Sequence, residues 1–355
     1  MTGVHWDISW HRSIGRDTFW TPAHIDIYLC GVLAGISCGY LILATTFRPD
    51  APLRKASVTL WGFRGPFGAF IAAWGGIAML TSAPFDDWWH NAYGLDVKII
   101  SPPHMVLAAG LMAVQLGALI LILGQMNRAE GAAQDRLRLF YLYVAGMILV
   151  CLNVLQMEMT FRSVMHTAHF YHLVAMVGPV VLAAAALGSG SRWGATAVAG
   201  VYTVFVMLMS WILPLFAAEP KLGPVYHQVK QFVPPEFPLL LIVPAFALDL
   251  LWQRTKSWNP WKLSAVSGAL FVAVFAAVQW PFANFLMSPL ARNWFFGTHY
   301  FGYYLRPESL YARNLFFPLE SGADLWQEIA WTLVTAILTT RLGLAAGSWM
   351  RRIRR

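Results

Sequence analysis

Long apolar stretches recur along the chain and are separated by short polar segments. Each stretch holds about 17 to 24 residues, the length with which a helix spans roughly 30 Å of hydrocarbon. Because hydrocarbon offers no partner to exposed backbone groups, a chain without a closed barrel crosses it as helices. The pattern predicts an all-α integral membrane protein, a polytopic bundle of about nine transmembrane helices. The predicted spans are residues 24–46, 67–83, 104–125, 139–157, 171–188, 194–216, 236–252, 263–284 and 327–346.

Composition supports this class and leaves no room for a large soluble part. Hydrophobic residues make up 58% of the 355 residues and charged residues only 12%, too few charges to solvate a soluble surface of this size. We expect two regions, residues 1–125 with three spans and residues 126–355 with about six spans. An aromatic external loop at 285–326 is expected to lie along the interface or to dock a partner.

Lysine and arginine gather in segments that fall on one side of a nine-span arrangement. Short cytoplasmic loops are enriched in these residues, so we predict the N-terminus outside and the C-terminus in the cytoplasm, in a bacterial inner membrane. The formal net charge of +8 is then mainly a topology signal and an attraction to anionic lipid, and nucleic-acid binding is not expected. The basic residues are Arg48, Arg54, Lys55, Arg64, Arg128, Arg136, Arg138, Arg192, Arg254, Lys256, Lys262, Arg351, Arg352, Arg354 and Arg355.

The histidines gather on the opposite side. All ten lie in the predicted external segments or in the first turn or so of an adjoining span. Because lysine and arginine alone set the topology, this asymmetry is an independent observation, and it predicts a site at the periplasmic face. Anchoring of helix ends at the interface is the alternative for any single residue. The histidines are His5, His11, His24, His90, His104, His166, His169, His172, His227 and His299.

One constellation of Asp and His occurs twice. Its spacing is Asp-x3-His-x12-His in the first copy and Asp-x3-His-x13-His in the second, with Trp before the first His in both. Residues four apart share a helix face, and Pro22 and Pro102 suit the first turn of a following helix that returns a second His. One carboxylate and two imidazoles suit non-haem iron, an open zinc site or a mixed copper site. The predicted metal sites are Asp7, His11 and His24, and Asp86, His90 and His104.

Further acidic and histidine residues are candidates for supporting roles. Asp17 and Asp96 occupy matching positions in the two copies and could accept the second ring N–H of a ligating histidine, with helix capping or solvation as the alternative. Glu158, His166 and His169 would fall within one arc of a continuous helix and are possible additional ligands.

The stretch Trp10–His24 carries a Trp-His pair followed by Arg-Asp-Thr-Phe-Trp-Thr-Pro-Ala-His. It resembles the signature of the C subunit of the copper membrane monooxygenases, the family of particulate methane monooxygenase and ammonia monooxygenase. The resemblance implies that the Asp and two His of the first copy bind one copper. The family has a neighbouring site spaced Asn-x3-His-x13-His, which the second copy matches except that Asp86 replaces Asn. The match covers roughly residues 5–125.

The resemblance makes a copper-dependent membrane oxidoreductase the leading functional hypothesis, a monooxygenase-like protein that oxidises a small apolar substrate with O2. It implies one or two copper ions and companion membrane and periplasmic subunits. Spacing alone leaves iron and zinc open. No haem, flavin or iron-sulfur motif occurs in the sequence, so electrons are expected from an outside donor such as a quinol. The alternative is a copper-binding membrane protein without turnover, for acquisition, delivery or a structural role.

Overall fold

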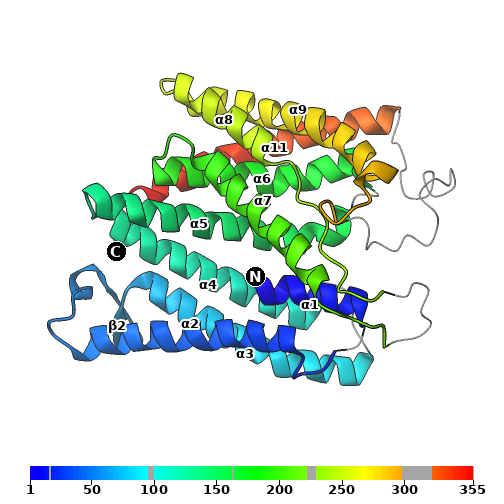
Figure 1. The fold of residues 1–355 in the computed structure, drawn as a ribbon. Coiled ribbons are helices and arrows are strands. Elements are labelled where there is room, and N and C mark those ends of the chain that lie inside the picture. The colour runs from blue at the N-terminus through cyan, green and yellow to red at the C-terminus, as the bar shows by residue number, and fades with distance from the viewer. Residues whose placement is uncertain (16, 95–99, 162–163, 222–228, 298–321, 355) are drawn as a thin grey trace. The chain divides into compact units, whose positions relative to one another are not determined.

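The computed structural model describes residues 1–15, 17–94, 100–161, 164–221, 229–297 and 322–354. Over these ranges it contains ten α-helices, several single-turn 3-10 helices and one two-stranded sheet (Figure 1). The chain is therefore all-helical in class, as the apolar pattern predicted.

Eight helices are long and apolar enough to cross a membrane, counted over the described ranges. This confirms an integral membrane protein that contacts lipid. The two remaining helices are α1 (Thr2–Ser13) and α8 (Ile242–Arg254). The eight are α2 (Pro22–Phe47), α3 (Phe67–Tyr93), α4 (Pro102–Met126), α5 (Gly131–Gln156), α6 (Ala168–Ser189), α7 (Gly194–Ile212), α9 (Pro260–Leu286) and α11 (Ala323–Met350), with α5 and α7 each extended by a 3-10 turn.

The ninth predicted span, at 236–252, is the one that the structure shortens. Its helix, α8, has 13 residues and is about 20 Å long, less than the hydrocarbon thickness. Pro234, Pro235 and Pro238 precede it, and proline removes a backbone donor and disfavours helix in the residue before it. The apolar pattern predicted a span from residue 236, but the prolines keep the helix from starting before Ile242.

The non-helical stretch before α8 finds hydrogen-bond partners inside unit 2, which is defined below. The Leu239 amide donates to Tyr202 Oη at 3.1 Å, and the Leu240 amide donates to Gln279 Oε1 at 2.9 Å. Gln279 is completely buried. Irregular backbone is tolerated at membrane depth only where protein or water satisfies it, which explains why a buried glutamine lies in α9.

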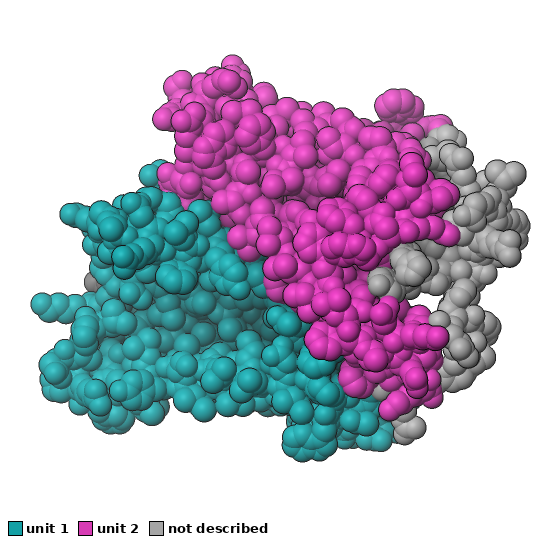
Figure 2. Space-filling view, in the orientation of Figure 1, with its two compact units in different colours: residues 1–7, 17–151, 349–355 teal, residues 8–16, 152–348 magenta. Residues whose placement is uncertain are grey.

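Two compact units divide the chain (Figure 2). Unit 1 comprises residues 1–7, 17–151 and 349–355, and unit 2 comprises residues 8–16 and 152–348. We expected a division at residue 125, whereas most of α5 belongs to unit 1. The boundary also passes through α1, whose first residues belong to unit 1 and whose last residues belong to unit 2.

A short hairpin joins α2 to α3. Strands β1 (Val58–Leu60) and β2 (Phe63–Gly65) pair antiparallel, and the two loop residues, Trp61 and Gly62, both have positive φ, as a type I′ turn requires. Thr46, near the end of α2, accepts a hydrogen bond from the Arg64 amide at 2.8 Å. The hairpin is thereby fixed to the helix that it follows, and α3 returns alongside α2.

Glycines allow α3 and α4 to pack backbone against backbone. A Cβ atom on Gly117 would lie 2.5 Å from the Gly68 carbonyl oxygen. One on Gly75 would lie 2.7 Å from the Gly110 carbonyl oxygen. Small residues of this kind drive helix association in membranes, where van der Waals contact replaces the hydrophobic effect. These contacts fix the distance and axial alignment of the two helices.

Close packing at glycine also joins α2 to α3. A Cβ atom on Gly76 would lie 2.6 Å from the Gly31 carbonyl oxygen. In Figure 1 α2, α3 and α4 lie side by side within unit 1 and run in alternating directions. The start of α2, the end of α3 and the start of α4 therefore lie together, and these helix ends carry the repeated Asp and His residues.

Unit 2 uses glycine in a similar way between its own spanning helices. A Cβ atom on Gly343 of α11 would lie 2.5 Å from the Val180 carbonyl oxygen of α6. One on Gly268 of α9 would lie 2.7 Å from the backbone nitrogen of Ile337 in α11. These glycines let the backbone of α11 approach that of α6 and of α9 closely.

We expect Gly117→Ala to destabilise the protein by about 1–3 kcal/mol, because the new methyl group would meet backbone that cannot move away. Gly39→Ala is the matched control, since nothing lies within 4 Å of a Cβ atom at that position. The control should be neutral or more stable by up to about 1 kcal/mol, because alanine is the better helix former. Thermal unfolding in nanodiscs measures both. Equal melting temperatures for the two variants would contradict the packing argument.

Candidate metal centre

The first half of the site begins where the chain turns between α1 and α2. Gly15 has a φ of 83°, a left-handed conformation that other residues rarely adopt, and it lies two residues after the end of α1 at Ser13. The Thr18 amide then donates to Thr21 Oγ1 at 2.8 Å, and Pro22 begins α2. The turn brings His24, in the first turn of α2, back toward α1.

His24 meets two carboxylates and one carbonyl within unit 1. Its Nδ1 lies 3.0 Å from the Thr18 carbonyl oxygen. Its Nε2 lies 3.0 Å from Asp7 Oδ1 and 3.3 Å from Asp17 Oδ2. All three side chains are largely buried, with 11% of His24, 17% of Asp7 and 6% of Asp17 exposed.

These contacts require a positive charge at Nε2. A carbonyl oxygen only accepts hydrogen bonds, so the contact with Thr18 places the proton of a neutral imidazole on Nδ1. Nε2 of His24 then presents a lone pair to the oxygens of Asp7 and Asp17. Electron-rich atoms at this distance repel one another unless a proton or a metal ion lies among them.

Asp17 lies beside the ring nitrogen of His24 that also faces Asp7. We expected it to accept the second ring N–H of a histidine, but the Thr18 carbonyl occupies that position at His24. Asp17 faces the same ring nitrogen as Asp7 and lies beside the predicted ligand atoms. The residue that matches it in the second copy, Asp96, lies outside the described part of the chain.

His11 follows Asp7 by one turn of α1, as the four-residue spacing predicted. The ligand atoms of Asp7, His11 and Asp17 lie within 4.8 Å of one another in this short stretch of chain. The group of the first copy that could hold a metal ion therefore contains the predicted Asp7 and His11, and it adds Asp17. His24 joins it through its contacts with the two carboxylates.

The second copy converges at the facing ends of α3 and α4. Asp86 and His90 lie one turn apart near the end of α3, and His104 lies in the first turn of α4. Asp86 Oδ2 lies 3.4 Å from His90 Nε2, and Asp86 Oδ1 lies 3.5 Å from His104 Nε2. One carboxylate thus lies between two imidazoles, and the ligand atoms of all three lie within 4.8 Å of one another.

Electrostatic interactions connect residues of the two copies. The charge of Asp86 acts on His24, and that of Asp17 acts on Asp86. Carboxylates of both copies thus act on His24, and carboxylates attract cations.

Tyr28 is a residue that the repeat did not reveal. It lies one helical turn after His24, and the centres of the two rings are 6.1 Å apart. Phe19 packs against it at 5.2 Å. The position four residues after His24 was the available signal, because it shares the same helix face. Tyrosine has no counterpart in the repeat, so spacing alone gave no reason to choose it.

The tryptophans that precede the first His of each copy have different surroundings. Trp89 packs against Tyr93 on α3, with ring centres 4.5 Å apart. Trp10 packs against Phe232 in unit 2, at 5.7 Å. The duplication therefore extends to the metal-ligand residues but not to the packing around the aromatic rings.

The additional candidates, Glu158, His166 and His169, do not share a continuous helix, so that expectation is wrong. Helix α5 ends at Gln156, a 3-10 turn covers Met157–Met159, and α6 begins at Ala168 with Thr167 as its cap. Glu158 is half-buried, His166 is completely buried beside Trp280 and His169 is exposed. No metal-holding group found over the described ranges includes any of the three.

Comparisons with protein-family models, with curated proteins and with solved structures give no match to this chain. The donors of the site are imidazole nitrogens and carboxylate oxygens, a mixed set that suits copper, zinc or non-haem iron and disfavours metals that need all-sulfur or all-oxygen ligands.

We expect Asp86→Asn to lower the affinity of the second group for a divalent metal by about tenfold or more, because the variant loses the negative charge that lies between His90 and His104. The first group keeps all its donors and should retain its metal. Titration of metal-free protein with Cu(II), followed by EPR, separates the two classes of site. Asp87→Asn is the control, since Asp87 is the adjacent carboxylate and lies outside both groups. Unchanged binding in Asp86→Asn would contradict the assignment of Asp86 as a ligand.

Proposed function

We propose that the protein is a copper-dependent membrane oxidoreductase, monooxygenase-like, that oxidises a small apolar substrate with O2. The observation that carries the proposal is the convergence of both copies of the motif. In each copy, carboxylate and imidazole donors that are well separated along the sequence lie close enough together in the fold to bind one ion. Together with the resemblance of Trp10–His24 to the C-subunit signature, this favours copper over iron and zinc.

Asp7, His11 and His24 would hold the first copper, with Asp17 beside them. Asp86, His90 and His104 would hold the second. The donor set fits, because each group offers imidazole nitrogen and anionic oxygen, and the Thr18 carbonyl holds His24 with Nε2 turned toward the carboxylates. Copper bound there supplies the capacity to activate O2 and to pass electrons to it.

The protein groups around the metal have separate tasks. Thr18 fixes the ring orientation of His24, as partners of metal-bound histidines do. Tyr28, one helical turn after His24, places its ring beside the imidazole. Phe19 packs against Tyr28, and Trp88, Trp89 and Tyr93 form an aromatic cluster near the end of α3, the helix that carries Asp86 and His90.

The location of the site suits a substrate that arrives from the bilayer. The metal groups lie at the ends of spanning helices, and the gathering of histidine opposite to lysine and arginine favours the periplasmic face of a bacterial inner membrane. In this proposal electrons come from a donor outside the chain, such as a quinol. Companion membrane and periplasmic subunits complete the complex, as the family resemblance implies.

Metal analysis with EPR tests the proposal. We expect the purified protein to contain copper, His24→Ala to lose it from the first group, and His104→Ala to lose it from the second. His169→Ala is the control, because His169 is an exposed histidine outside both groups. EPR of the two site variants should lose different signals, since their ligand sets differ.

Two outcomes would overturn the proposal, one by excluding the redox function and the other by excluding the metal site. Protein that holds zinc alone would remove the redox function but keep the metal site. Copper content that is the same in His24→Ala, His104→Ala and His169→Ala would remove the site itself. Both results are read from metal content, so neither depends on finding the substrate.

A copper-binding protein without turnover is the second candidate, with acquisition, delivery or a structural role. The number of carboxylates favours it, because Asp7, Asp17 and Asp86 would hold a divalent ion firmly. Transport across the membrane gains little support from Asp249, the buried carboxylate of α8. That carboxylate accepts hydrogen bonds from the Ala195 and Thr196 amides at 3.2 and 2.8 Å and so caps α7.

Oxygen consumption distinguishes the two candidates. Copper-loaded protein in nanodiscs with a reduced quinol and a short alkane should consume O2 if it is an oxidoreductase, and His24→Ala should not. Thermal stability that depends on copper, without O2 consumption or an oxidised product in the presence of the companion subunits, would favour the second candidate.

A further inference from the structure

A cavity of about 520 Å³ lies within unit 1, away from the metal-holding groups. It is bounded by the first residues of α1, by one face of α2 and by Leu111 of α4. Small-molecule sites have volumes of about 300–1,000 Å³ and mostly apolar walls with a few polar groups. The walls here fit that description, since Val4, Leu33 and Leu111 are apolar and the polar side chains are few.

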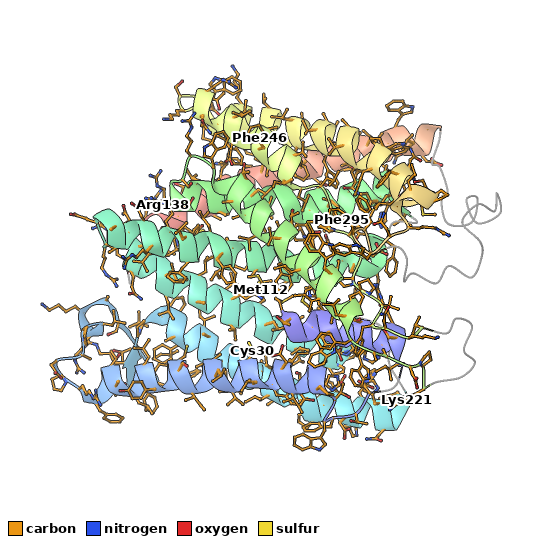
Figure 3. The ribbon with its side chains drawn as sticks, viewed as in Figure 1. Cys30, Met112, Arg138, Lys221, Phe246 and Phe295 are labelled. Atoms are coloured by element: carbon orange, nitrogen blue, oxygen red, sulfur yellow. The ribbon has the colours of Figure 1, made fainter. Side chains whose placement is uncertain are left out.

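The face of α2 that lines the cavity is a regular stripe. Asp26, Cys30, Leu33 and Ser37 follow one another at helical spacing, so they extend about 16 Å along the helix. Cys30, labelled in Figure 3, packs against the core cluster that includes Leu111. The cavity is therefore elongated along α2, with a carboxylate at one end and a hydroxyl group at the other.

Asp26 is the one charged side chain among the residues that line the cavity. Its position is held by α1, because a Cβ atom on Gly3 would lie 2.9 Å from Asp26 Oδ2 and 2.9 Å from the Ala23 carbonyl oxygen. The backbone of α1 thus packs directly over the first turns of α2. An ionisable residue within a spanning helix is costly, and such residues usually serve binding or transport.

We propose that this cavity binds a single-chain amphiphile whose head group donates a hydrogen bond to Asp26 and whose alkyl chain lies along Cys30, Leu33 and Ser37. A hydroxyl or an ammonium head group satisfies the carboxylate. The phosphate of an ordinary phospholipid carries the same charge as Asp26 and is disfavoured there. Asp26 lies two residues after His24, on a different side of α2, so this site is separate from the metal groups and does not depend on them.

Photolabelling of the full-length protein in phosphatidylcholine nanodiscs tests the proposal. The probe is n-decanol with a diazirine at the middle of its chain, and labelled residues are located by mass spectrometry. We expect labels on Leu33, Ala34 and Leu111. Excess n-decanol and excess n-decylamine should each reduce the labelling, and their relative potency shows which head group binds more tightly. Excess n-decane should compete at least about tenfold less well, because it lacks the donor to a charged acceptor.

Two substitutions test the site, one by filling the cavity and one by removing the carboxylate. Ala34→Trp fills the cavity and should abolish the labelling of Leu111. Asp26→Ala should weaken competition by n-decanol by about tenfold and leave that by n-decane unchanged. Val32→Trp is the matched control, because Val32 lies on the same helix at 37% exposure and does not line the cavity. It should label as the wild type does.

The result that would overturn the proposal is labelling spread over the exposed residues of α2 in proportion to their exposure. Equal competition by n-decane and n-decanol would overturn it as well, since the cavity would then be only a surface for bulk lipid. Both measurements use wild-type protein, so they stand even if Asp26→Ala does not fold.

Discussion

The close contact of α2, α3 and α4 through glycine is the constraint on which the metal-holding region depends. Between membrane helices there is little hydrophobic gain in association, so van der Waals contact must supply the specificity. Gly31, Gly75, Gly110 and Gly117 let carbonyl oxygens approach to distances that any larger residue would prevent. The start of α2, the end of α3 and the start of α4 are thereby held together. The carboxylate and imidazole side chains that they carry are held together with them.

This rigid packing makes it possible to gather like charges. Asp7 and Asp17 both face Nε2 of His24, and Asp86 lies between two imidazoles. Isolated in a poorly solvated place, such groups would repel and move apart. Because α2, α3 and α4 touch backbone to backbone, the side chains at their adjoining ends are held close to one another. A metal ion could bind several of these donor atoms at once, whereas a proton binds to one of them.

Much of the fold follows from the sequence, because hydropathy and length determine which segments cross a membrane. Eight of the predicted spans correspond to long apolar helices. The ninth is short because Pro234, Pro235 and Pro238 interrupt an apolar stretch, a local effect that an averaged hydropathy does not register. The continuous helix predicted from Glu158 to His169 also breaks, because α5 ends at Gln156 and α6 begins at Ala168.

The sequence by itself determined the membrane class, the duplicated spacing of Asp and His, and the pairing of Asp7 with His11 and of Asp86 with His90, because each of these depends on a local period. The tertiary structure decided which atoms meet: His24 Nε2 lies against Asp7 and Asp17, and His104 lies against Asp86. It also decided that the ring of Tyr28 lies beside that of His24. The reason is physical. A helix fixes neighbours four residues apart, but the approach of separate helices depends on where their backbones can touch.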